Sequence, residues 1–420
     1  MPSLREVVVT GVGVVSPLGV GREAFWSALL EGRSGVERLG YAGGENFPTP
    51  IGAEIKDFAP KKYVKPRKSL KVMCPEIQTG YSAAALAMED AGLEKGRVPP
   101  DRMGVTWGGE MLQSDPFEMA DAYKKCVANG VLKPEQWGEG AMSDLYPLWM
   151  LKYLPNMAAC HVGIAYDARG HNNTLTLEDV SFLLALAEAS DVIQRGWTDV
   201  VLVGAAGTRT NLVSLLYRGC RDYSKRTDPP SSACRPFDAH RDGSVPGEGA
   251  AALVIESREH AEQRGATALA RLAGYSRTFG ASPQGPPSVA AAAGRSIQAA
   301  MQAANWSPEQ VGCIHANGLG EMEMDRWEAE AIAAHLPQTP VTALKSYLGD
   351  SGCGSAALET AAAVLALQHG QIPATLNYET PDAECPVNVV SQVRVLEQPR
   401  ILCLNQSRNG QAAAAALESV

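Results

Sequence analysis

The chain has 420 residues, of which 45% are hydrophobic and 20% are charged, and its formal net charge is −9. At about 150 residues per domain this length suggests two or three globular units. The acidic balance argues against nucleic acid as a partner, because phosphate binding needs clustered Lys and Arg. No stretch offers about 18 uninterrupted apolar residues, so we predict no membrane span.

The nine cysteines and seven histidines are scattered along the chain, and no Cys-x-x-Cys pair occurs. This odd, dispersed set fits reduced thiols better than a disulfide framework or a zinc site. The N-terminus, MPSLREVVVTGVG, begins a strand at once and lacks the basic, apolar and small-residue regions of a secretory signal. We therefore expect a cytoplasmic protein without a metal site.

Strands and helices are predicted to alternate through most of the chain. Strands are expected near residues 7–9, 103–107, 174–177, 199–203, 251–255, 268–273, 311–315, 341–343, 391–396 and 401–404. Helices are expected near 22–31, 77–92, 180–196, 287–304 and 325–335, with another ending near 368. Such alternation predicts mostly parallel sheets covered by helices on both faces. The rhythm repeats, which suggests two related halves, residues 1–258 and 259–420.

A Gly-rich turn is predicted after the first strand, at Gly11 and Gly13. As a dinucleotide-binding signature this pattern is weak, because Ser16 stands where the third glycine is needed.

The segment PKKYVKPRKSLKV, residues 60–72, is strongly basic within an acidic protein. It is either a solvated run of charges or a docking patch for an acidic partner. The residues concerned, called the basic patch below, are Lys61, Lys62, Lys65, Arg67, Lys68 and Lys71.

Residues 110–155 form a predicted excursion of helices and loops that is rich in large side chains, including Trp137, Tyr146, Trp149 and Tyr153. Such a segment could line an apolar tunnel or pack against a neighbouring subunit.

The stretch 172–196, NNTLTLEDVSFLLALAEASDVIQRG, runs from a short strand into a helix that is apolar almost all round. A helix of this kind belongs in the protein interior. Asp179 then lies at a buried helix N-terminus, where free N–H groups and the helix dipole favour an anion or a nucleophile. One interpretation is a helix cap, which aspartate favours; the other is a role in a functional pocket.

Five stretches together resemble the β-ketoacyl synthase family, in its elongating branch that acts on carrier-protein-bound chains. They are VVVTGVGVVSPLG, PNMAACHVG, CRPFDAHRDGSVPGEGAAALVIE, KSYLGDSGCGSAALE and LNYETPDAECPVNVV, in matching order and spacing over nearly the whole chain. The resemblance implies a thiolase-like five-layer α-β-α-β-α fold. It also implies a homodimer or heterodimer built across the strand before Asp179, and no cofactor other than the phosphopantetheine of an acyl carrier protein as substrate arm.

Members of that family condense thioesters through one cysteine and two histidines. Counted from Gly170 and Asn172, the cysteine position falls on Asp179. The first histidine position, in the stretch IHANGLGEMEMD, falls on Asn317, and the second, in KSYLGDSG, falls on Asp350. An aspartate is a poor nucleophile toward a thioester, and a carboxylate at 350 would repel a developing enolate. The resemblance therefore implies that the usual condensation route is lost.

Other family positions are either retained or changed. The buried ion pair expected behind the site is kept as Lys345 and Glu359, and Asp325 is kept as well. The threonines that contact phosphopantetheine in the family fall on Leu319 and Glu321, and the phenylalanine gate falls on Asn409. Cys160, Cys353, His161 and His315 are read as packing or loop residues without chemistry.

Three functional hypotheses remain open from the sequence. The first is a partner of an active ketosynthase that resembles a chain-length factor in polyketide or fatty-acid synthesis, although that subgroup typically carries glutamine where Asp179 stands. The second is an enzyme that uses Asp179, Asp350 and Asn317 as acid, base and oxyanion donor. The third is a non-catalytic acyl- or carrier-protein-binding module that docks through the basic patch.

Overall fold

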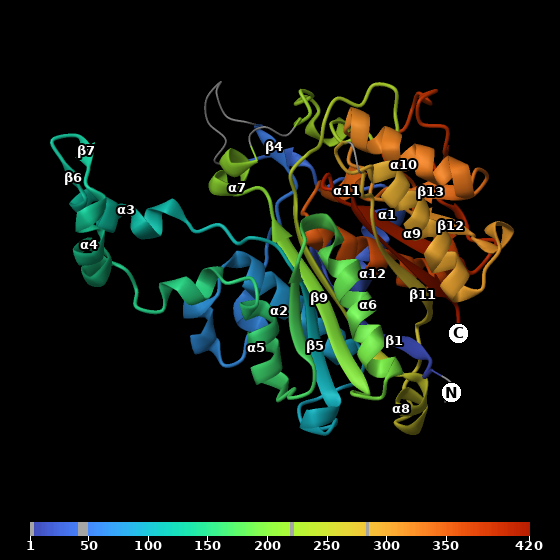
Figure 1. Ribbon diagram of the computed structural model, residues 1–420, viewed down its shortest axis with the longest axis horizontal. Helices are drawn as coiled ribbons and strands as arrows, with labels where there is room; N and C mark the ends of the chain where they lie inside the picture. The colour runs from blue at the N-terminus through green and yellow to red at the C-terminus, as the bar shows by residue number, and fades with distance from the viewer. Residues whose placement is uncertain (1–3, 41–48, 219–221, 283–284) are drawn as a thin grey trace.

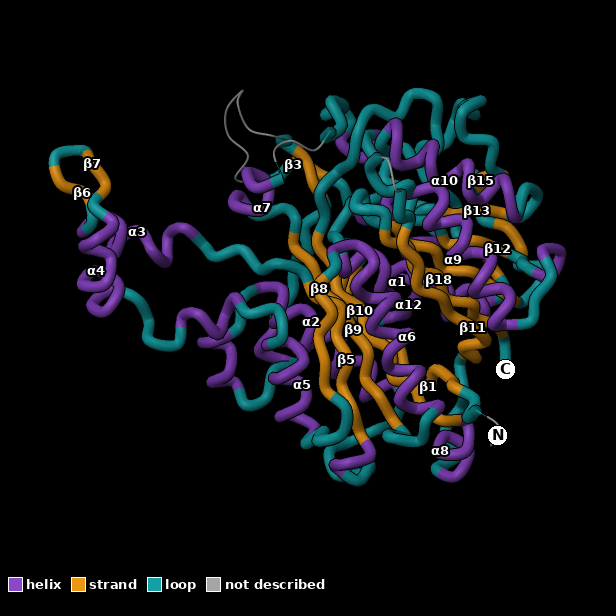
Figure 2. The backbone as a smooth tube through the Cα atoms, viewed as in Figure 1, coloured by secondary structure: helices purple, strands orange, loops and turns teal. Residues whose placement is uncertain are grey.

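The computed structural model describes residues 4–40, 49–218, 222–282 and 285–420. Within these ranges one sheet of twelve strands runs through the molecule (Figures 1 and 2). Its order is β15 (Asn388–Val389), β13 (Pro340–Thr342), β12 (Cys313–His315), β17 (Arg400–Gln406), β18 (Gln411–Glu418), β11 (Ala270–Phe279), β1 (Val7–Ser16), β10 (Glu248–Ser257), β9 (Val200–Thr208), β5 (Met103–Gly109) and β8 (Asn172–Thr176), with β2 (Gly19–Val20) on β1. The short pairs β3 (Glu37–Arg38) with β4 (Ile51–Gly52) and β14 (Gln371–Ile372) with β16 (Arg394–Val395) lie apart from it.

The helices form three layers around this sheet (Figure 1). α2 (Pro75–Asp90) and α5 (Met157–Tyr166) cover the outer face of β1, β10, β9 and β5. α6 (Ser181–Gln194) and α12 (Cys353–His369) lie in the middle, and α9 (Val289–Ala304) with α10 (Met322–His335) covers the outer face beyond β11. The layer order α-β-α-β-α that the family resemblance implies is confirmed. The division into halves at residue 258 stays a prediction.

Outside the arm described below, the remaining α-helices are short connections at the ends of strands. They are α1 (Arg22–Leu30), α7 (Leu212–Tyr217), α8 (Arg258–Gln263) and α11 (Lys345–Leu348).

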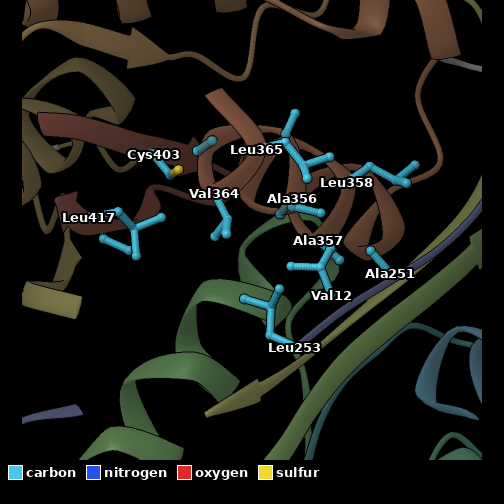
Figure 3. Packing of buried hydrophobic residues seen from close by; sticks show 14 of the residues in the cluster. Val12, Ala251, Leu253, Ala356, Ala357, Leu358, Val364, Leu365, Cys403 and Leu417 are labelled. Atoms are coloured by element: carbon cyan, nitrogen blue, oxygen red, sulfur yellow. The ribbon is translucent and has the colours of Figure 1, made fainter. Parts of the chain in front are cut away.

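The core lies between the two halves of the sheet, around α12. Every residue of this helix from Cys353 to Leu367 is buried. Figure 3 shows Ala357 of α12 close to Val12, with Leu253 nearby, in the first half of the sheet. A helix that is apolar on all sides is stable only when packed on all sides, and α12 therefore fixes how the two halves of the sheet meet.

The prediction of mostly parallel sheets was wrong for the centre of the molecule. The six central strands pair antiparallel, in the order β9, β10, β1, β11, β18 and β17. The strands at both ends of the sheet pair parallel: β9, β5 and β8 at one end, and β17, β12, β13 and β15 at the other. Strands β17 and β18 are joined by a tight hairpin, which returns the chain antiparallel without a crossover helix. The sequence did not predict β18, because its alanine-rich run, QAAAAALE, has low strand propensity.

The predicted turn at Gly11 and Gly13 was also wrong, since both residues lie within β1. Helix α2 crosses β1 at this point. A Cβ on Gly13 would lie 1.9 Å from the Ala83 oxygen, and one on Gly11 would lie 2.3 Å from the Ala87 oxygen. These glycines therefore permit close helix–sheet packing.

Residues 113–153 form an arm that leaves the body beyond the edge strand β8 (Figures 1 and 2). The arm holds α3 (Pro116–Lys125), the hairpin β6 (Val127–Ala128) and β7 (Val131–Leu132), and α4 (Trp137–Asp144), so the predicted excursion is confirmed. Several of its large apolar side chains are exposed, among them Phe117 at 80% and Met142 at 88%. In the described ranges no helix is long and apolar enough to cross a bilayer.

Candidate functional site

Asp179 is buried at the junction between β8 and α6, as the sequence predicts, with 2% of its surface exposed. Glu178 has a left-handed φ of 53°, and one turn of 3-10 helix, Glu178–Val180, leads into α6. The cap interpretation was wrong, because no side chain caps this turn or α6. The Asp179 carboxylate instead faces a cation.

That cation is Arg209, which is 2% exposed and joins three carboxylates. Its Nη2 lies 2.9 Å from Asp179 Oδ1 and 3.0 Å from Glu110 Oε1, and its Nη1 pairs with Asp350 Oδ2. Burial disfavours the charged guanidinium, but the charges of Asp179 and Asp350 outweigh this effect and raise the pKa of Arg209. The structure thus brings two of the three predicted site residues onto one arginine.

Sequence reasoning missed Arg209 and its partner Glu110, although a signal was present. Each follows a buried apolar strand, Glu110 after β5 and Arg209 after β9. β5 and β9 are parallel neighbours, so their carboxyl ends meet at the same edge of the sheet. Opposite charges at the ends of two adjacent buried strands predict an ion pair there.

A second arginine extends this cluster toward the surface. Arg218 is 6% exposed and pairs with Glu110, and its Nη1 lies 3.7 Å from Glu178 Oε1. Below, the term ion cluster refers to Glu110, Asp179, Arg209, Arg218 and Asp350. Two arginines and three carboxylates give the cluster a formal charge of −1.

The third predicted residue, Asn317, is held by the retained ion pair. Lys345 Nζ donates to Asn317 Oδ1 at 2.7 Å and to Glu359 Oε1 at 2.7 Å, and all three residues are at most 2% exposed. The Glu359 charge, together with that of Asp350, overcomes burial and raises the pKa of Lys345. Because Lys345 occupies Oδ1, the amide nitrogen of Asn317 is the group left for a ligand, and this buried nitrogen has no hydrogen-bond partner among the described residues.

Asp325 supports the loop that carries Asn317. Its carboxylate accepts hydrogen bonds from the backbone nitrogens of Phe237 at 2.9 Å, Leu319 at 2.8 Å and Gly320 at 3.1 Å. Burial nevertheless raises the pKa of Asp325 to about 6. Its role as pocket support is therefore to fix the backbone of the loop.

The nearby thiol and imidazole groups are not activated. Cys353 is buried and its Sγ lies 3.2 Å from the Ala206 oxygen, and burial raises its pKa to about 12. His315 Nδ1 lies 3.0 Å from the Glu359 backbone oxygen, and burial lowers its pKa to about 4. A thiol nucleophile needs a lowered pKa, so neither group substitutes for a cysteine–histidine pair.

The loop that carries Leu319 and Glu321 is tied to the β17–β18 turn. Glu321 is 3% exposed and pairs with Arg408, next to Asn409. An ion pair therefore stands where the resemblance expects hydroxyl contacts to a phosphopantetheine arm.

The basic patch lies on the surface, away from these buried groups. All six of its cations are exposed, and among the described residues none of the six forms an ion pair. This geometry is compatible with docking of an acidic partner.

As a whole, the ion cluster is poorly suited to acid–base chemistry. Asp350 Oδ2 accepts a hydrogen bond from Arg209, whereas Asp179 Oδ1 forms an ion pair with Arg209 and accepts no hydrogen bond among the described residues. Asn317 retains a free amide donor. The arrangement can hold charge and offer one hydrogen bond, but it contains no activated nucleophile among the described residues.

Comparison with known proteins identifies the class to which this fold and site belong. The model of the β-ketoacyl synthase N-terminal domain matches residues 4–261, and that of the C-terminal domain matches residues 269–379. The chain therefore belongs to the β-ketoacyl synthase family.

Relatives and solved structures agree with this family over almost the whole chain. The 3-oxoacyl-[acyl-carrier-protein] synthase 2 of Coxiella burnetii is 32% identical over 392 residues, covering 92% of this chain and 91% of the relative. The tetracenomycin polyketide synthase ketoacyl synthase alpha subunit of Streptomyces glaucescens is 31% identical over 409 residues, covering 93% and 91%.

A β-ketoacyl synthase from Burkholderia phymatum superposes with a TM-score of 0.88 at 27% identity, covering 99% of this chain and 100% of that one. The ishigamide ketosynthase/chain length factor superposes at 0.86 and 26% identity, covering 100% of both chains. A type II polyketide synthase acyl-carrier protein in complex with its ketosynthase gives 0.84 at 28% identity, covering 99% and 100%. The thiolase-like fold is thereby confirmed.

Proposed function

We propose that this chain is a non-condensing subunit of fatty-acid or polyketide biosynthesis that pairs with an active ketosynthase, as a chain-length factor does. The observation that carries the proposal is Arg209, which lies between Asp179 and Asp350. In the resemblance these two residues stand at the positions of the nucleophile and of one catalytic histidine. A centre filled by a buried arginine has no thiolate and no imidazole to offer.

The surroundings of Asp179 also oppose a bound acyl intermediate. An acyl chain attached at residue 179 would need apolar space, because burying apolar surface provides the binding free energy. The side chains that gather there are Arg209, Glu110 and Arg218, all less than 7% exposed. Displacing them would leave buried charges unpaired, which costs several kcal/mol.

The edge strand and the arm support the pairing part of the proposal. Among the described strands β8 has a neighbour, β5, on one side only, so its other side is an open edge along which another chain can pair. The arm extends past this same edge (Figure 2), and its exposed apolar side chains suit contact with another subunit. A relative of similar fold is a ketosynthase/chain length factor, and we propose a partner of that class here.

The test is co-expression with an active ketosynthase, using a proline to block the edge strand. The Thr174 N–H donates to the Asn173 side chain at 2.8 Å and not to β5, so Thr174→Pro leaves the β5–β8 ladder in place. We expect Thr174→Pro to abolish co-purification and Thr174→Val, which keeps the N–H, to preserve it. The proposal fails if the wild-type chain forms a stable homodimer alone and never co-purifies with a ketosynthase, or if it condenses thioesters unaided.

A second candidate function, a carrier-protein-binding module, has its own observation in the exposed basic patch. A carrier that docks there by charge should bind more weakly as salt rises. Absent or salt-insensitive binding would count against it. Carrier-protein binding is compatible with a non-condensing subunit, since one chain can both pair with a ketosynthase and bind a carrier protein at its basic patch.

The third hypothesis, acid–base catalysis by Asp179, Asp350 and Asn317, is weakened by the arginine that engages both carboxylates. It stays a prediction with a direct test. Unchanged turnover of a pathway intermediate in Asp179→Ala and Asp350→Ala would rule it out.

A further inference from the structure

A pocket of about 620 Å³ lies in the outer helical layer, at the C-terminal ends of α2 and α5, which contact each other (Figure 1). It is called the tyrosine pocket below, because Tyr63, Tyr81 and Tyr166 line it. A larger pocket of about 750 Å³ lies elsewhere, at the C-terminal end of β9, where the segment before α2, the base of the arm and the start of α7 surround it and the buried Glu76 contributes to its lining. The two pockets share no lining residue, and no residue of the ion cluster lines the tyrosine pocket.

The innermost lining of the tyrosine pocket is apolar and buried. Met88 is 1% exposed, and Tyr81 and Leu93 are each 4% exposed. Tyr63 and Tyr166 are half-buried and line the pocket nearer the surface. A concave, mostly apolar space within the range of about 300–1,000 Å³, with a few polar groups, is typical of a small-molecule site.

The three tyrosines come from three different elements. Tyr63 follows the 3-10 helix η1 (Pro60–Lys62), Tyr81 lies on α2, and Tyr166 is the last residue of α5. Tyr63 is itself stacked on Phe58, with ring centroids 6.2 Å apart and 14° between the ring planes. Aromatic rings gain free energy from stacking or edge-to-face contact beyond the area that they bury. Three rings around one space therefore favour a flat aromatic ligand over a flexible aliphatic chain.

Part of the rim carries cations without carboxylates. Residues 60–72 contain no Asp or Glu, and Lys62 and Lys65 of this segment line the pocket. Both are exposed and form no ion pair among the described residues. The end of α2 and the loop after it contribute the other charged lining residues, which are Glu89, Glu94 and Lys95. Cations thus outnumber carboxylates by three to two, and an anionic group is attracted to the side of Lys62 and Lys65.

The tyrosine hydroxyls differ in what they offer to a ligand. The Tyr81 hydroxyl donates to the Lys65 backbone oxygen at 3.1 Å and is therefore engaged. The Tyr166 hydroxyl makes no hydrogen bond within the described part of the chain. Burial raises the pKa of Tyr166, and the nearby Tyr81 and Glu89 raise it further. The Tyr166 hydroxyl therefore keeps its proton and is the group left to hydrogen-bond a ligand.

We propose that the tyrosine pocket binds a hydroxylated aromatic carboxylic acid, without a covalent bond. The ring packs against Tyr63 and Met88, the carboxylate lies at Lys62 and Lys65, and the ring hydroxyl hydrogen-bonds the Tyr166 hydroxyl. The inference does not depend on the proposed pairing with a ketosynthase, since no residue of β8, the arm or the ion cluster lines this pocket.

The test measures binding of 6-hydroxy-2-naphthoate, called hydroxynaphthoate below, to the full-length chain by calorimetry. The comparison ligands are naphthoate without the hydroxyl, naphthol without the carboxylate, and octanoate without the rings. We expect saturable binding of hydroxynaphthoate, about fivefold weaker binding of naphthoate, and binding of naphthol weaker by about tenfold or more, because hydrogen bonds to charged groups are the stronger ones. Octanoate should bind more weakly than naphthoate, because it offers no ring to the tyrosines.

A filling variant tests whether the ligand occupies this pocket. Ala165→Trp fills it, and Ile164→Trp is the matched control, since Ile164 lies on the same helix, is 72% exposed and does not line the pocket. We expect Ala165→Trp to weaken binding of hydroxynaphthoate at least tenfold and Ile164→Trp to leave it unchanged. If Ala165→Trp fails to fold, Ala85→Phe fills the pocket from α2.

Two further variants test the ends of the ligand. Lys65→Gln should weaken binding of hydroxynaphthoate but not of naphthol, whereas Lys68→Gln, an exposed neighbour outside the pocket, should change neither. Tyr166→Phe should weaken binding of hydroxynaphthoate and leave binding of naphthoate unchanged.

Four outcomes would overturn the inference. They are no saturable binding of hydroxynaphthoate, binding of octanoate as tight as that of naphthoate, equal weakening by Ala165→Trp and Ile164→Trp, and equal effects of Lys65→Gln and Lys68→Gln. Binding is measured without a ketosynthase or a carrier protein. Failure of the pairing proposal is therefore distinguishable from failure of the tyrosine pocket.

Discussion

The two sides of the C-terminal end of β9 differ: one is filled by the ion cluster, and the other borders an open pocket. On one side Arg209 and its carboxylates fill the position where the family resemblance expects chemistry. On the other side, beyond Thr208, an apolar pocket of about 750 Å³ is left open. The space around Asp179 is therefore filled by paired charges, whereas the neighbouring pocket is open and mostly apolar.

Stability alone does not explain the ion cluster. Replacing a buried ion pair by well-packed apolar residues is often neutral or stabilising, because desolvation of the charges offsets their attraction. Its charges depend on one another, however, since removing one partner strands the others. Under the proposed function, the cluster would act as a unit that keeps substrate away from residue 179.

The largest expected effect comes from Arg209→Met, which removes the cation that joins the three carboxylates of the ion cluster. The change strands Asp179, Asp350 and part of Glu110 in a buried site, and breaking such a pair typically costs about 3–5 kcal/mol. We expect the free energy of unfolding, measured by denaturant titration, to fall by this amount.

The matched control is the triple variant Arg209→Met, Asp179→Asn, Asp350→Asn. It removes the stranded charges along with the arginine, so most of the lost stability should return. A loss below about 1 kcal/mol in Arg209→Met alone would contradict the view that the cluster is one interdependent unit.

The next effect concerns Glu76, on the open side. The native pKa of about 6 is above the ordinary value of 4.5, so the folded state binds a proton more tightly than the unfolded state. The stability that this proton contributes is fully present below pH 4.5 and is lost as the pH rises through 6. Between pH 4 and pH 7.5 we expect wild type to lose about 2 kcal/mol more than Glu76→Gln, since one pKa unit corresponds to about 1.4 kcal/mol.

Unfolding titrations at both pH values check this expectation, with the exposed Glu94→Gln as the control for removing one carboxylate. Parallel losses in wild type and Glu76→Gln would mean that the floor of the pocket is wetter than its burial indicates.

Much of this architecture could be read from the sequence, and the failures have physical causes. The apolar run of α6 predicted the buried position of Asp179, and the family resemblance implied the ion pair of Lys345 with Glu359 that the structure contains at 2.7 Å. The partner of Asp179 could not be read from the local pattern, because Arg209 reaches it through sheet topology. β18 escaped prediction because alanines form a strand only when long-range ladders decide their conformation.

The smallest effect concerns the rigidity of the pocket wall that the base of the arm forms. Asp115 caps α3 at the base of the arm, and losing such a cap costs about 1 kcal/mol. Because the arm has few contacts with the body (Figure 1), Asp115→Ala should raise hydrogen exchange in residues 116–125 without lowering the global free energy of unfolding. Ser288→Ala removes the equivalent cap of α9, a helix packed on the sheet, and should leave exchange in the arm unchanged. If Asp115→Ala lowers global stability by the full cost of the cap, the arm unfolds together with the body, and the pocket wall is as rigid as the ion cluster beside it.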